Sequence, residues 1–81
     1  MPRGWIQGKP VTALMRQLMQ EARDEGAVVV EGAREFYASL ILCRWGWLES
    51  TPVGDGTHII RLTRFGRNVL DGELAERDGA G

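Results

Sequence analysis

Few residues in this chain could do covalent or metal chemistry. It holds one histidine, His58, and one cysteine, Cys43, and neither lies at a spacing from other ligands that is typical of a metal site. Cys43 has no neighbouring base in sequence to activate a thiolate, so we expect a buried, unreactive side chain. Gly54 and Gly56 belong to a short turn, not to a glycine loop that binds phosphate. We therefore expect no catalytic site, no metal and no cofactor.

Positive charge is the other chemistry that the sequence offers. Its densest cationic group is His58, Arg61, Arg64 and Arg67. Arg64 and Arg67 share one face if their segment is helical, because they are three residues apart. Together with two cations near the N-terminus, Arg3 and Lys9, the group could bind phosphates. Solvated charges that balance the acidic C-terminal segment are an equally good interpretation.

Composition limits the class of protein. The 81 residues fit one domain, with 43% hydrophobic residues and a net charge of −1. Nucleic-acid binders commonly carry a basic excess, so DNA binding by this chain would have to depend on local clustering. The single cysteine, together with the lack of a leader or a membrane-spanning apolar run, predicts a cytoplasmic protein with no membrane partner. We expect a flexible arm over residues 1–9, a domain over 10–76 and a disordered tail over 77–81.

Apolar periodicity predicts a first helix and a strand. Apolar residues recur at helical spacing from Val11 to Ala22, which predicts a helix over about residues 10–25. Pro10 suits its first turn, and Gly26 suits its end. The β-branched run over 27–30 predicts a strand.

A second helix, a hairpin and a third helix are expected to follow. The second helix spans about residues 33–45, and strands over 47–51 and 57–63 enclose a loop of turn-forming residues. Thr63 is expected to cap a last helix that carries four apolar residues, Phe65, Val69, Leu70 and Leu74. The order helix, strand, helix, hairpin, helix predicts a small α+β domain.

The second helix needs a buried face. Stepping 100° per residue, we expect a core face made of Ala33, Phe36, Tyr37, Leu40 and Ile41. The outward face would then hold Arg34, Glu35, Ala38, Ser39, Leu42 and Trp45. Arg44 falls near the middle of the expected core face, where its stem could pack while its guanidinium reaches a carboxylate.

Two motifs stand in order in the second half of the chain. Residues 46–49 (Gly-Trp-Leu-Glu) directly follow the second helix, and residues 62–70 (Leu-Thr-Arg-Phe-Gly-Arg-Asn-Val-Leu) open the last one. With the hairpin between them, residues 33–74 resemble the winged-helix domains of MarR- and PadR-like transcription regulators. The resemblance implies that the second helix is the recognition helix and the hairpin is the wing. Gly46 would end the helix in a left-handed turn, and Gly66 would allow close packing against the hairpin. Residues 26–32 hold a strand and a turn, where the family has a further helix.

Two functions follow as hypotheses. The resemblance implies a dimeric transcription regulator of a prokaryote or virus that binds double-stranded DNA. The residues that would contact DNA are Arg34, Ser39, Arg61, Arg64 and Arg67. The alternative is a winged-helix scaffold that binds protein, as a subunit or inhibitor of a larger complex, through Trp5, Leu42 and Trp45. The near-zero net charge, Asp55 in the wing and the apolar pair on the outward helix face favour this alternative.

Overall fold

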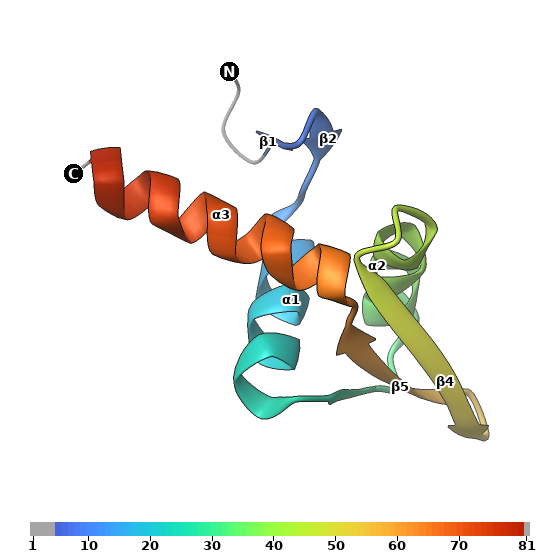
Figure 1. Cartoon of the computed structure of the whole chain (residues 1–81). Helices are drawn as coiled ribbons and strands as arrows, with labels where there is room; N and C mark the ends of the chain where they lie inside the picture. The colour runs from blue at the N-terminus through green and yellow to red at the C-terminus, as the bar shows by residue number, and fades with distance from the viewer. Residues whose placement is uncertain (1–4, 81) are drawn as a thin grey trace.

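The computed structural model in Figure 1 describes the backbone of residues 5–80 and the side chains of residues 6–72. The elements in chain order are β1 (Trp5–Ile6), β2 (Lys9–Pro10), α1 (Ala13–Glu25), β3 (Val28–Val30), α2 (Ala33–Arg44), β4 (Leu48–Gly54), β5 (Thr57–Leu62) and α3 (Arg64–Ala80). β1 and β2 form a small hairpin, and the other three strands form an antiparallel sheet in the order β3-β5-β4. The predicted α+β class and order of the main elements are confirmed. In the described part of the chain, no helix is both long and apolar enough to cross a bilayer.

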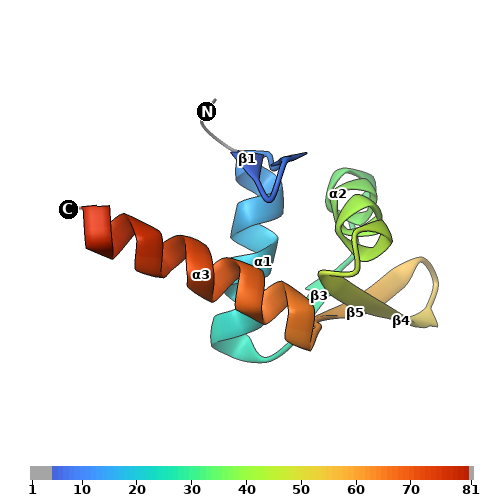
Figure 2. The same ribbon diagram turned by 45° about the horizontal axis from the view of Figure 1, so that its top comes forward.

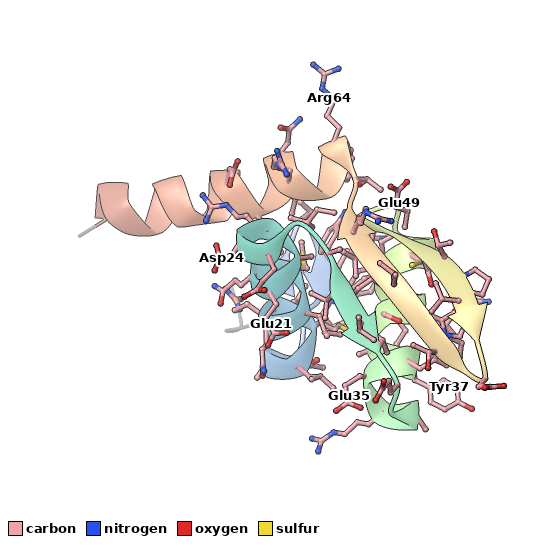
Figure 3. The ribbon with its side chains drawn as sticks, turned by 90° about the horizontal axis from the view of Figure 1, so that it is seen from below. Glu21, Asp24, Glu35, Tyr37, Glu49 and Arg64 are labelled. Atoms are coloured by element: carbon pink, nitrogen blue, oxygen red, sulfur yellow. The ribbon has the colours of Figure 1, made fainter. Side chains whose placement is uncertain are left out.

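The three-stranded sheet is covered on one face. Val30 and Ile60 turn their side chains into the core, which α1 and α2 close from the same side. Val29, between two inward valines, is 59% exposed on the opposite face, which is turned toward the viewer in Figure 3. β4 and β5 meet at a two-residue turn, Asp55-Gly56, in which both residues have positive φ, as the tightest hairpin turns require.

The start of α1 differs from the sequence prediction. The helix begins at Ala13, and the backbone N–H of Met15 donates a hydrogen bond of 3.1 Å to the hydroxyl oxygen of Thr12. Because Thr12 caps the helix, Pro10 is not helical and instead ends β2. The predicted end is confirmed: Gly26 closes α1 with a left-handed φ of 84°. The apolar face of α1 is buried as predicted.

The N-terminal segment forms the β1–β2 hairpin over part of the range for which the sequence predicts a flexible arm. Gln7 and Gly8 both have positive φ and form its turn. Ile6 is buried in the core cluster with Val11, so this hairpin is attached to the domain by an apolar side chain. Residues 1–4 of the predicted arm lie outside the described residues.

α2 turns to the core the face opposite to the one predicted. Leu42 and Ser39, both expected to point outward, are 0% and 1% exposed. Tyr37, Leu40 and Ile41, expected to be core residues, are 65%, 40% and 38% exposed. The predicted orientation of this helix is therefore wrong by about half a turn.

Side-chain size explains the orientation of α2. The helix is apolar on both sides, so periodicity alone does not select the buried face. Small side chains at Ala38 and Ser39 let it lie close to its neighbours, α1 and β4. The Ser39 hydroxyl remains satisfied because it donates a hydrogen bond of 2.7 Å to the carbonyl oxygen of Phe36. Phe36 itself packs half-buried against the core, whereas Ala33 is exposed.

A junction around Thr63 joins α2, the hairpin and α3. The Thr63 N–H donates to the Trp47 carbonyl oxygen at 3.1 Å, and its hydroxyl donates to the Gly46 carbonyl oxygen at 2.6 Å. The same hydroxyl oxygen accepts the Gly66 N–H at 2.9 Å, which confirms Thr63 as the N-cap of α3. Gly46 adopts a φ of 79°, so the left-handed end of α2 is also confirmed.

Gly66 packs directly on the hairpin. A Cβ atom at this position would overlap the Trp47 carbonyl oxygen and lie 2.7 Å from the carbonyl carbon. Trp47 is buried in the core. α3 then continues to Ala80, over most of the segment for which the sequence predicts a tail. Phe65, in the first turn of α3, is exposed.

Replacing Gly66 with alanine should destabilise the domain by about 3 kcal/mol, because overpacking against backbone cannot be relieved by a rotamer change. Gly72→Ala is the matched control in the same helix, since a Cβ there would meet nothing within 4 Å. The control should be neutral or stabilise the protein by up to about 1 kcal/mol. Urea denaturation followed by circular dichroism measures both, and equal effects of the two variants would contradict the proposed contact.

The orientation of α2 can be tested with the same substitution at two positions. Leu42→Ala should lower the free energy of unfolding by about 3 kcal/mol, because it leaves a cavity in the core. Leu40→Ala, two residues away on the exposed face, should cost less than about 1 kcal/mol. Chemical denaturation measures the free energy of unfolding of both variants. A larger loss for Leu40→Ala than for Leu42→Ala would support the orientation predicted from the sequence.

Candidate interaction surface

The cations proposed to contact DNA do not form one surface. Arg61 lies in β5, and Arg64 and Arg67 lie in the first turn of α3; all three are exposed. Arg34 lies at the start of α2, next to Glu35. Figure 3 places Glu35 and Arg64 at opposite ends of the molecule. Arg34 is therefore not brought together with Arg61, Arg64 and Arg67.

The other predicted DNA contacts are also altered. Ser39 is buried and bonded within its own helix, so it cannot reach a base edge from the surface. Arg61 stands directly opposite Glu49 in the β4–β5 ladder, which offsets its charge. The exposed end of the hairpin holds Asp55, and residues 50–57 contain no lysine or arginine.

His58, one of the four residues of the predicted cationic group, is not exposed. Its ring packs half-buried on Phe36, with the ring centroids 4.6 Å apart. Its Nδ1 atom is buried without a hydrogen-bond partner among the described residues. His58 therefore belongs to the packing of β5 against α2 and is not part of a cationic surface.

Cys43 is half-buried and packs against the core. Burial raises the pKa of the Cys43 thiol, and the negative charge of Glu49 raises it further. Both effects disfavour the reactive thiolate. Among the side chains that the structure describes, no three histidines, cysteines or acidic residues gather as a metal site would require.

The predicted protein interface is rearranged as well. Leu42 is buried and cannot contact a partner. Trp45 is half-buried, with its ring edge-on to Trp47 at a centroid distance of 5.1 Å and the Lys9 ammonium 5.8 Å from its centroid. Trp45 thus packs largely on its own domain. The side chain of Trp5 lies outside the described residues.

Instead, four residues of α2 form an exposed surface, here called the α2 outer face: Tyr37, Leu40, Ile41 and Arg44. They recur at positions i, i+3, i+4 and i+7, so they make one continuous stripe along the helix. They line a shallow hollow of about 390 Å³. Tyr37 is 65% exposed and appears near the end of the hairpin in Figure 3. The stripe is apolar in the middle, with a phenol at one end and a guanidinium at the other.

One signal in the sequence could have identified this face. Arg44 lies one turn beyond Leu40 and Ile41, and a charged side chain in the middle of a core face is costly unless it is paired. Small residues at Ala38 and Ser39 mark the face that can approach a neighbour closely. Together these two features favour the observed orientation over the predicted one.

Comparison with protein-family models, curated proteins and solved structures gives no match. The function of the α2 outer face must therefore be inferred from its own chemistry. Tyrosine and arginine are residue types that are enriched where proteins bind one another, and the two aliphatic side chains between them add apolar contact area.

Proposed function

We propose that this chain is a winged-helix scaffold that binds another protein through the α2 outer face. The observation that carries the proposal is the exposure of Tyr37, Leu40 and Ile41 side by side on the helix that lies next to the hairpin. Contiguous exposed apolar groups on a small domain commonly mark a contact surface. Covering them with a partner removes their apolar area from water.

The scaffold is proposed from the order and pairing of its elements. A helix, a short strand, a helix, a hairpin and a last helix occur with sheet order β3-β5-β4. Figure 2 shows α2 beside the β4–β5 hairpin, and the proposal assigns these two elements as the recognition helix and the wing. The motifs of the sequence resemblance occupy the junctions: Gly46 ends α2, and Thr63 caps α3.

The chemistry of the α2 outer face favours protein over DNA as its ligand. Leu40 and Ile41 can make only apolar contacts in a major groove, such as with a thymine methyl group. The end of the hairpin carries Asp55, which phosphates would repel. Arg44 suits either ligand, but at the edge of an apolar stripe it resembles the arginine anchors of protein interfaces.

Leu40→Asp should abolish partner binding, because it places a charge in the middle of the buried contact. The control is Val53→Asp, which introduces the same charge at an exposed apolar site in the hairpin. Sedimentation velocity tests a second copy of the chain as the partner, and affinity capture from a host extract tests other proteins. A captured protein is then purified and titrated by calorimetry, with at least a tenfold loss of affinity expected for Leu40→Asp. A partner that binds wild type and Leu40→Asp equally would overturn the assignment of this surface.

A second candidate function is DNA binding, favoured by the exposure of Arg64 and Arg67 one turn apart at the start of α3. Fluorescence anisotropy against a mixed-sequence duplex at low and physiological salt tests it. DNA binding predicts an affinity that falls steeply with salt and is lost when Arg64→Ala is combined with Arg67→Ala. Under the protein-binding proposal, no complex forms even at low salt.

A further inference from the structure

The outer edge of β3 is unpaired. In the sheet order β3-β5-β4, this strand has β5 as its only neighbour, and no other strand of the described residues pairs with it. A strand edge carries backbone N–H and C=O groups that can bond another extended chain. Natural sheets commonly cover or charge such an edge, so its surroundings indicate whether it is protected or used.

A groove follows this edge. One hollow of about 460 Å³ lies between α1 and β3 and reaches the start of α2. A second hollow, of about 410 Å³, is lined by the end of α1 and the start of β3. Glu21, Val28 and Val29 line both hollows, so the two lie next to each other along the strand. Aliphatic side chains of Leu14 and Leu18 form part of the groove wall on α1.

The charges around the groove have one sign. The ionisable residues that line it are Glu21, Glu25, Glu31 and Glu35, and none of its lining residues is a lysine or an arginine. They are spread along the whole length of β3: Glu21 and Glu25 on α1, Glu31 just after the strand, and Glu35 at the start of α2. Figure 3 shows Glu21 beside β3 and Glu35 near the far end of the strand.

We infer that the edge of β3 binds an extended, basic segment of a partner protein, which adds to the sheet as a fourth strand. The backbone edge supplies hydrogen bonds, and the groove supplies selectivity. Successive side chains of an added strand point to opposite sides, so a segment that alternates aliphatic and basic residues fits the aliphatic wall and the carboxylates. This site is separate from the α2 outer face and does not depend on it.

The carboxylates would also oppose the pairing of this edge with a second copy of itself. Two β3 edges brought together would place Glu31 and Glu21 of each copy near those of the other. Like charges at that range repel and oppose self-association. The same charges attract a cationic segment. The carboxylates along β3 would therefore disfavour pairing with a second copy and favour a basic partner.

The test uses a fluorescein-labelled peptide of six alternating lysine and valine residues, blocked at both ends, titrated against the whole protein at low salt. Binding should raise the anisotropy, and in ¹H–¹⁵N spectra it should shift the amide signals of Val28–Val30. A peptide N-methylated at every residue lacks backbone N–H donors and should not bind. A peptide of alternating glutamate and valine should not bind either. Equal binding of all three peptides, or signals that shift at α2 and not at β3, would overturn the inference.

Charge variants provide the matched comparison. Glu21→Gln with Glu31→Gln removes two charges from the groove and should weaken binding about fivefold. Glu49→Gln with Asp55→Asn changes the net charge by the same amount on the β4–β5 hairpin and should weaken it less than twofold. If the two double variants lost the same affinity for the peptide, overall charge alone would explain the attraction, and the groove site would be rejected.

Discussion

The close contact between the backbones of Trp47 and Gly66 determines how the second half of the domain is assembled. The Trp47 carbonyl accepts the N–H of Thr63 at 3.1 Å, and Gly66 lies against the same peptide group with no room for a Cβ. Thr63 completes the junction by bonding the end of α2 through Gly46 and the first turn of α3 through Gly66. Three elements are therefore fixed relative to one another by the Thr63 hydroxyl and by backbone groups, and the close contact requires glycine at position 66. Their positions hold one face of α2 on the core and leave the α2 outer face open.

The sequence predicted local features well where one residue type determines the outcome. Gly26 and Gly46 end helices with positive φ, and Thr63 caps α3 through its hydroxyl, as their types require. The apolar stripe of α1 was predicted correctly because its other side is polar, leaving one choice of buried face. Pro10 was placed in α1 wrongly, because a proline suits either a first helical turn or a strand end, and the cap at Thr12 decided between them.

α2 shows why the candidate site could not be predicted from the sequence. Its apolar residues surround the helix, so periodicity allowed two orientations, and tertiary packing selected the one that buries Ser39 and Leu42. Because the predicted orientation of α2 was wrong by about half a turn, residues expected on the surface lie in the core and residues expected in the core lie on the surface. The edge of β3 was also beyond sequence reasoning, because a free edge depends on the order of strands in the sheet. Glu21 and Glu31 look like ordinary solvated charges until that order brings a helix and a strand together around a groove.

The separation of surfaces on so small a domain has a consequence for stability. A chain of 81 residues buries a modest fraction of its surface, so each apolar side chain left exposed is a substantial loss of stabilisation. Leaving Tyr37, Leu40 and Ile41 on the surface is therefore costly unless a partner covers them. A partner that binds only the folded state raises the free energy of unfolding in proportion to the logarithm of its concentration over its dissociation constant. Under the proposed function, recognition and stability are linked at the α2 outer face, because the contact that recognises a partner would also bury the apolar side chains that the chain alone leaves exposed.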